Sequence, residues 1–517
     1  MSIVIIDLNL EGFMAFESSN FSVAKKNSLP KSELKVECNI PVEQEINKIF
    51  SITTDVNVQS NEVLTGFINF VGVIDICVIY CALDGSVGTI HTSCSFSSKI
   101  EDKNISVGQL ADINVKVVDH EVQNISSSNI KLLCMIEQDG VVILNENINT
   151  IRSNAECICT KEEQMAVVKL IGNTTSVINE ENSVSIKEEV KKVLLCESQV
   201  CVKDVECGLN FVSVSGELVN RILYINNDDK FESCYNYETF KEEVELEGVT
   251  RDSVAECYVN VLKEQVKTEV VEMEKGVDLK IVTPIELKIN AYEDINIEII
   301  KDVYSTNCEL GISTESFSMT KTLACEYFEN KIDGNLILSE DKARVDKLMF
   351  IGGTNLVIFN SYILDGEVYV EGIARTNVVY LNDELNTLNS VNIEVPFVVS
   401  DKTQIEGENI KTKAQAIICD VDVVVKKGRE FYFDAKIKVK VDFYVDQTCA
   451  IISSVEEKEE YSEKDYSVEL LFCQKGMSLW DVSKQAKIRE ELIVIQNPDV
   501  NFPLEKDTNV VIYFQKA

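Results

Sequence analysis

One pattern occurs three times in the sequence, and this repetition constrains the fold more than any other feature. A glycine is followed eight residues later by a tyrosine that aliphatic residues precede, in the pairs Gly72 and Tyr80, Gly216 and Tyr224, and Gly372 and Tyr380. The three glycines are 144 and 156 residues apart. A recurring interval of this size indicates duplicated structural units.

Two further landmarks keep the same register in all three copies. A phenylalanine lies 24, 24 and 25 residues after the glycine, at Phe96, Phe240 and Phe397. A short amphipathic segment begins 26, 26 and 27 residues before it, at residues 46–50, 190–194 and 345–349. Three landmarks in constant order indicate one copied unit.

The residues between the landmarks favour strands. Apolar and polar residues alternate, most plainly over 437–443, with the period of a half-buried strand. Turn signals separate these runs at 84–85, 226–229, 382–383 and 427–428. The chain has six prolines, which suits long paired strands. We therefore predict a mainly β fold of three β-sandwich or partly open barrel domains.

One short helix is expected in each copy. In the first copy, Ile46, Ile49 and Phe50 follow the i, i+3, i+4 spacing of a helix face. The predicted copies span 33–140, 160–293 and 320–448, and residues 1–32 precede the first landmark. Residues 453–465 contain a run of glutamates and are predicted to form an acidic linker before a small α+β module at 466–517.

Charge and composition exclude several functions. The formal net charge of −37 disfavours nucleic acids and anionic membranes. The apolar run 71–83 is interrupted by Asp75 and is too short to span a bilayer, and the N-terminal residues lack a secretory pattern. We expect a cytoplasmic protein. The 17 cysteines follow no disulfide framework and are predicted to be core thiols.

No catalytic centre is expected. The two histidines, His91 and His120, both lie in the first copy and have no metal-ligand spacing. Cys157 and Cys159 are too close together for a zinc knuckle without a second pair. The turn at 352–355 lacks the lysine of a phosphate loop. We therefore predict no enzyme activity, no metal and no cofactor.

The last fifty residues have a different pattern. Residues 467–473 are predicted to form a strand, Ser478 to cap a helix with Asp481 in its first turn, 488–495 to form a second helix and 510–514 a closing strand. The stretch KGMSLWDVSKQAKIREELIVIQNPDV resembles the LysM pattern. It departs from that pattern at Met477 and in the loop 503–507, which replaces the usual Pro-Gly-Gln.

The resemblance places the candidate binding residues in two loops. These partner-binding candidates are Gly476, Met477, Ser478, Leu479, Trp480, Gln496, Asn497, Pro498 and Asp499. Two alternatives remain for the single tryptophan, which either packs in the core of the module, with a shared role in an interface included, or anchors a protein partner. Asn497 is either a binding residue or a helix C-cap before proline.

Three such copies followed by a LysM-like module resemble the SipL-like proteins of endospore-forming bacteria, which carry SPOCS domains and a terminal LysM domain. The third copy has a proline before its phenylalanine, at Pro396, which the first two copies lack. The resemblance implies a non-enzymatic scaffold in the mother-cell cytoplasm, at the forespore surface. Its LysM module would dock a coat-morphogenesis ATPase, and other coat proteins are possible partners. The alternatives are binding of peptidoglycan (N-acetylglucosamine) through the LysM module, and a structural repeat protein that the module merely caps.

Overall fold

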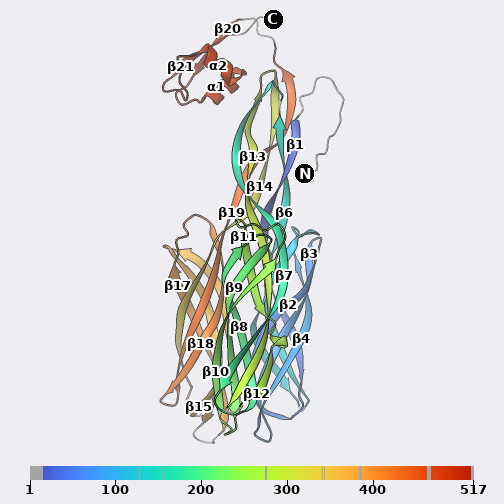
Figure 1. The fold of residues 1–517 in the computed structure, drawn as a ribbon, viewed down its shortest axis with the longest axis vertical. Helices are drawn as coiled ribbons and strands as arrows, with labels where there is room; N and C mark the ends of the chain where they lie inside the picture. Colours follow the sequence, from blue (N-terminus) through green and yellow to red (C-terminus); the bar gives the residue numbers. More distant parts are fainter. Residues whose placement is uncertain are drawn as a thin grey trace.

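The computed structural model describes residues 16–126, 128–153, 155–273, 276–340, 342, 344–382, 387–462 and 467–513. The described chain is mainly β, as predicted, and its two α-helices both lie near the C-terminus. The molecule is elongated: a β-rich body at one end narrows into a stalk, and a small module lies beside the tip of the stalk (Figure 1).

The first set of strands forms two three-stranded antiparallel sheets. One sheet has the order β2-β3-β4, and the other sheet has the order β1-β6-β5. The strands are β1 (Phe16–Pro41), β2 (Ile46–Leu64), β3 (Phe67–Ala82), β4 (Val87–Glu101), β5 (Leu110–Ile125) and β6 (Asn129–Ser153). Buried side chains from both sheets, including Cys38, Ile40, Ile74, Ile76, Ile130 and Leu132, share one core. We call this set the first unit.

The second and third units repeat this arrangement. The second consists of β7 (Ile158–Ile186), β8 (Val190–Cys207), β9 (Phe211–Asn226), β10 (Phe231–Glu245), β11 (Val254–Val261), the 3-10 helix η1 (Lys263–Gln265), β12 (Lys267–Glu272) and β13 (Val277–Ser305). The third consists of β14 (Cys308–Ile337), β15 (Val345–Leu364), β16 (Glu367–Asn382), β17 (Leu388–Lys402), β18 (Ile410–Lys426) and β19 (Glu430–Glu460). In every unit three consecutive strands form an antiparallel meander, and the first and last strands of the unit form a long antiparallel pair.

The repeat landmarks occupy equivalent positions in the three meanders. Each glycine lies on the central strand directly opposite the landmark phenylalanine of the next strand, in the pairs Gly72 with Phe96, Gly216 with Phe240 and Gly372 with Phe397. In the third unit, a Cβ added to Gly372 would lie 2.5 Å from the carbonyl oxygen of Val357 and 2.7 Å from Cζ of Phe397. Only glycine leaves room for the ring, so the spacing seen in the sequence reflects a cross-strand contact.

The predicted helix in each unit is wrong. Residues 46–50, 190–194 and 345–349 begin strands β2, β8 and β15. Each of these strands has two register shifts within its first few residues, between Ile46 and Lys48 and between Ile49 and Ser51 in β2. A bulge adds one residue and reverses the side-chain alternation. Two bulges three residues apart therefore produce the spacing of three and four that indicated a helix.

The units are longer than predicted, and the expected linker at 453–465 is not a linker over its first part. Strand β19 continues to Glu460 and pairs with β14, with Glu456 opposite Gly311 and Glu460 opposite Cys308. Residues 463–466 lie outside the described residues. The first unit likewise begins at Phe16 and ends at Ser153. These extensions lie outside the landmark meander, so the repeat pattern gave no sign of them.

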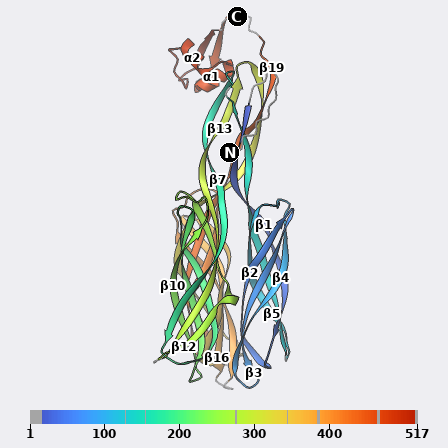
Figure 2. The same cartoon turned by 45° about the vertical axis from the view of Figure 1, so that its right-hand side comes forward.

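The extensions of the three long antiparallel strand pairs form the stalk. It comprises residues 16–24, 145–153, 158–170, 292–305, 308–322 and 444–460. Apolar residues from all three strand pairs pack together inside the stalk, including Val23, Ile148, Val167, Ile299, Phe317 and Ile451. Figure 2 shows the paired strands rising from the units toward the module. The glutamates of residues 456–460 are tolerated because all five residues of this segment are exposed, so no carboxylate is buried there.

A small apolar cluster also joins the units at their meanders. Phe50, Leu194 and Phe350, one from each of the bulged strand beginnings, pack together with Ile79, Leu223 and Val379 from the central strands. The segments predicted to be helices therefore hold the three units against one another.

Candidate functional site

The C-terminal module (residues 467–513) has the predicted order of strand, helix, helix and strand. Its elements are β20 (Val468–Cys473), α1 (Leu479–Ala486), α2 (Glu490–Gln496) and β21 (Thr508–Tyr513), with β20 and β21 antiparallel. Ser478 caps α1 as predicted: its hydroxyl accepts a hydrogen bond from the Asp481 backbone, and the Asp481 carboxylate accepts one from the Ser478 backbone. Buried Cys473, Val482, Ile493, Val510 and Ile512 form the core.

The first predicted loop is hydrogen-bonded to the loop that precedes β21. The Gly476 amide donates to the Leu504 carbonyl at 2.7 Å, and the Leu504 amide donates to the Met477 carbonyl at 3.0 Å. Met477 and Leu479 pack partly against the module core. Gly476 is exposed, with a φ of 90° that favours glycine. This loop therefore has a structural role that accounts for most of its residues.

Trp480 is neither in the core of the module nor free. It is 8% exposed, and its indole Nε1 donates to Asp302 Oδ2 at 2.8 Å, on strand β13 of the stalk. Its ring lies edge-on to Tyr304, with ring centroids 5.0 Å apart. The sequence offered two roles for this residue, and the structure instead places it in an interface between the module and the stalk of the same chain.

The second predicted loop is partly committed to the fold. The Gln496 side chain pairs with the backbone of Tyr513, at 3.0 Å and 2.9 Å. Asn497 is buried and caps the C-terminal end of α2, and its amide exchanges two hydrogen bonds of 2.8 Å with the Val511 backbone. Pro498 and Asp499 are exposed. Only these last two residues of the loop are free of such a structural commitment.

Replacing Asn497 with alanine is expected to destabilise the module without any specific effect on recognition. The change leaves the amide and carbonyl of Val511 without their side-chain partner, a loss of about 1–3 kcal/mol per buried polar group. Thermal unfolding of the full chain, followed by the emission of Trp480, measures the effect. Asp499→Ala, two residues later and exposed, is the control and should leave the midpoint unchanged.

An apolar surface that sequence reasoning missed lies on the outer face of the two-stranded sheet. Val468, Leu470 and Phe472 alternate along β20 and are exposed, as is Tyr513, which lies opposite Val468 on β21. Leu470 is 67% exposed. The alternation was visible in the sequence, but a two-stranded sheet has one face to spare, and the pattern alone does not reveal which face the helices cover.

Helix α2 carries further exposed apolar side chains. Leu492 and Ile495, three residues apart and so on one side of the helix, are exposed, whereas Ile493 is fully buried. We define Val468, Leu470, Phe472 and Tyr513, on the outer face of the sheet, as the apolar surface of the module, and count the pair on α2 separately. A concentration of large exposed apolar side chains in so small a unit is typical of a protein-binding surface.

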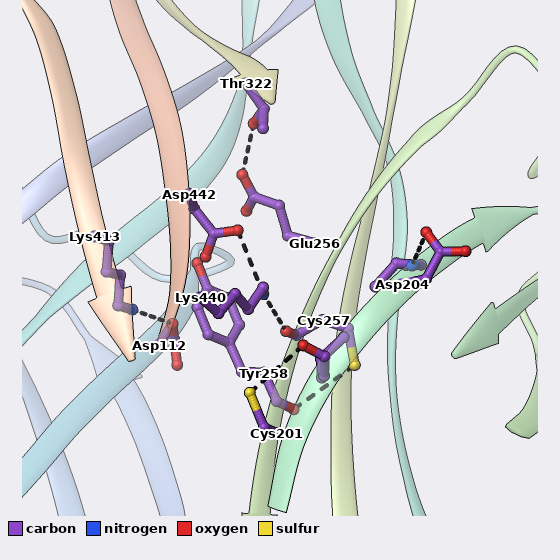
Figure 3. Close-up of polar contacts among 12 residues, drawn as sticks. Asp112, Cys201, Asp204, Glu256, Cys257, Tyr258, Thr322, Lys413, Lys440 and Asp442 are labelled. Atoms are coloured by element: carbon purple, nitrogen blue, oxygen red, sulfur yellow. Dashed lines mark hydrogen bonds and ion pairs between the residues drawn. The ribbon is translucent and has the colours of Figure 1, made fainter. Parts of the chain in front are cut away.

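A buried polar cluster joins the three units below the stalk (Figure 3). Glu256 of β11 accepts hydrogen bonds from Lys26 of β1, at 2.5 and 2.7 Å. It also accepts one from the hydroxyl of Thr322 of β14, at 2.6 Å, which is drawn in Figure 3. Burial acts to raise the pKa of Glu256, but Lys26 and Thr322 outweigh it and hold the pKa below its ordinary value of 4.5. Glu256 is therefore ionised and bonded to both other units.

The rest of the cluster also consists of charges that neutralise one another. Lys440 and Asp442 of β19 lie 3.3 Å apart, and Lys440 donates to the Cys257 carbonyl of β11 at 3.1 Å. Lys413 of β18 lies 3.6 Å from Asp112 of β5. Burial raises the pKa of the Cys257 thiol to about 12, so the thiol stays protonated and is a poor nucleophile. This arrangement suits a structural junction.

The two histidines contact different partners. Burial lowers the pKa of each, and their ring nitrogens lie near Cys77 Sγ for His91, at 3.8 Å, and near Thr54 Oγ1 for His120, at 3.5 Å. Within the described ranges, no group of three or more His, Cys, Asp or Glu side chains is arranged to hold a metal ion. Across the same residues, no helix has the length and apolarity needed to cross a membrane.

The fold defines a mainly β protein built from repeated pairs of sheets, with a small helical module at its end. Residues 45–125 and 189–271 match the family model described as SipL, SPOCS domain. The matched segments contain β2 to β5 and the equivalent β8 to β12, so the match supports the predicted similarity to SipL in the first two units. No curated protein and no solved structure compared with the chain matches it.

Proposed function

We propose that this chain is a non-enzymatic adaptor in endospore coat assembly, and that its LysM-like C-terminal module docks a coat-morphogenesis ATPase on the forespore surface. The SPOCS match in two units supports the link to sporulation. The observation that carries the docking role is the apolar surface of the module, which faces away from the module core and is not covered by the stalk residues that contact α1.

The same geometry supports a protein partner over a glycan. Apolar side chains such as Leu470 and Phe472 form the exposed sheet face, and burial of such anchors in an interface contributes on the order of 2 kcal/mol each. In the second predicted loop, the amide groups of Gln496 and Asn497 are already bonded to β21, so they offer fewer free groups to acetamido sugars.

Leu470→Asp is expected to weaken retention of the ATPase by roughly 30-fold or more, because a charge replaces an exposed apolar anchor. The measurement is binding of the purified ATPase to the full chain, for instance by biolayer interferometry. Lys506→Ala, an exposed change in the loop before β21, is the control and should bind normally. Folding of both variants is checked through Trp480, which does not belong to the apolar surface.

Unchanged binding by Leu470→Asp and by Phe472→Asp together would reject this surface as the docking site. Retention of the chain on purified peptidoglycan, with no affinity for the ATPase, would instead support the glycan-binding alternative.

A further inference from the structure

Helix α1 of the module holds the end of strand β13 with charged and polar groups. One carboxylate, that of Asp302, accepts from Trp480 Nε1 at 2.8 Å and from Lys484 Nζ at 2.6 Å. Trp480 and Lys484 are four residues apart and therefore share one face of the helix. The two oxygens of a single acidic side chain are each bonded to a different residue of that face.

The aromatic residue two positions later completes the contact. Tyr304 lies edge-on to the Trp480 ring and donates its hydroxyl to the Ile488 carbonyl at 2.8 Å. Asp302 and Tyr304 occupy alternate positions of an extended strand, so both side chains point toward the module. The acid and the aromatic ring thus contact adjacent parts of one surface.

Two flanking contacts widen this interface. Arg489 donates to the Glu156 carbonyl near the start of β7, and Lys487 lies over the ring of Tyr461 with its Nζ 3.4 Å from the ring centroid. Both basic residues follow α1 directly. The surface that faces the stalk is therefore basic and aromatic, and it is distinct from the apolar surface of the module.

We infer that this face of α1, with Trp480 and Lys484, forms together with the Ile488 carbonyl just beyond the helix a recognition site for an extended segment of the form acid-x-aromatic. In the isolated chain the stalk fills the site with its own Asp302 and Tyr304. A segment of another protein with the same chemistry would compete for it, and the module would then leave the stalk. This site goes beyond the proposed docking of the ATPase and does not depend on it.

The chemistry explains why this segment is selected. Hydrogen bonds from an ammonium and an indole N–H to a carboxylate are stronger than neutral ones, and an edge-on pair of aromatic rings adds to their burial. Lys484 and Asp302 are only partly buried, so salt screens their attraction. The contact is therefore strong enough to dock the module on the stalk and weak enough for a competing segment to displace the stalk.

The single tryptophan of the chain reports directly on this site. In the full chain, Asp302→Ala is expected to lower the ratio of docked to undocked modules by roughly tenfold or more, through loss of two charge-assisted hydrogen bonds. The emission of Trp480 should shift to longer wavelength, and quenching by acrylamide should increase severalfold. Glu298→Ala, which removes an exposed carboxylate from the same strand, is the matched control and should change neither quantity.

A peptide with the sequence of residues 300–306, added to the Asp302→Ala chain, should restore the blue-shifted and protected emission. The same peptide with alanine in place of its aspartate should not. Emission that stays protected in Asp302→Ala, or a peptide that has no effect at millimolar concentration, would overturn the inference. If Asp302→Ala fails to fold, Lys484→Ala and a salt titration of the unmodified chain test the same contact.

The outcome is separable from that of the ATPase experiment. Loss of ATPase binding in Leu470→Asp with protected Trp480 emission concerns the apolar surface alone. Exposure of Trp480 in Asp302→Ala with normal ATPase binding concerns the recognition site alone.

Discussion

Replacing Glu256 with glutamine is expected to lower the free energy of unfolding by about 3–5 kcal/mol, because the change leaves Lys26 as a buried charge without its partner. Both side chains are nearly excluded from solvent, and Glu256 binds to strands of all three units. The loss should therefore affect the cohesion of the whole body. Chemical denaturation followed by far-ultraviolet circular dichroism measures it.

A matched control is available at the surface of the same unit. Glu206 and Lys241 form an ion pair of 3.8 Å in which both side chains are largely exposed. Exposed pairs of this kind contribute about 0–1 kcal/mol, so Glu206→Gln should have little effect. Equal losses in the two variants would contradict the structural role of the buried pair.

The stability difference between the unmodified chain and Glu256→Gln depends on pH with a defined sign. The pKa of Glu256 is lower in the folded chain than its ordinary value, so the unfolded chain takes up a proton at higher pH than the folded chain does. The stabilisation is complete above the unfolded pKa and is lost as the pH falls through the folded pKa. The gap between the unmodified chain and Glu256→Gln should therefore be constant at neutral pH and narrow below roughly pH 5.

Phe397→Ala is expected to cost about 3–5 kcal/mol, since it removes a buried ring from the core of the third unit and leaves Gly372 facing a cavity. Phe397 is 7% exposed, whereas the next residue, Val398, is 61% exposed on the opposite face of the strand. Val398→Ala should change stability by less than about 0.5 kcal/mol. Thermal unfolding of both variants measures the comparison.

The companion change Gly372→Ala tests the other half of the pair. The added methyl group would clash with the Val357 carbonyl and with the Phe397 ring, so it should also destabilise the unit, by about 1–3 kcal/mol. Gly311→Ala is its control, because a Cβ there meets first the flexible end of the Lys458 side chain. A neutral Gly372→Ala would mean that the pair does not explain the recurrence of glycine and phenylalanine.

The sequence predicted the meanders well for a physical reason. Gly72, Gly216 and Gly372 recur because each faces a ring across one pair of strands, and that contact depends on local register alone. The turns at 84–85, 226–229 and 427–428 also lie between strands as expected, whereas 383 lies outside the described residues. Local patterns thus predicted local structure.

The failures have one common origin. The segment 46–50 was predicted to be a helix because its apolar spacing was interpreted without knowledge of the partner strand, and the bulges that create this spacing exist only in the paired state. The glutamates of 456–460 indicated a linker for the same reason, since their pairing with residues 308–311 is distant in sequence.

The candidate site shows the same division. The sequence predicts the N-cap at Ser478 and offers the C-cap as one of two alternatives for Asn497, because helix ends depend on nearby residues. The contact between Trp480 and Asp302 joins residues 178 positions apart, and nothing in the pattern around either one indicates the other. The sequence identified the important tryptophan without its partner.

The long antiparallel strand pairs also determine how far apart the chain can hold two bound molecules. Strand β19 contains 31 residues, of which residues 444–460 belong to the stalk, and at about 3.3 Å per residue this stalk part runs for roughly 55 Å. A molecule bound at the tip of the stalk would therefore be held at a distance from anything bound to the three units. Inter-strand hydrogen bonding keeps this distance constant. In a layered assembly such a chain would act as a spacer of fixed height, and shortening β14 and β19 in matched pairs would bring the layers closer by a calculable amount.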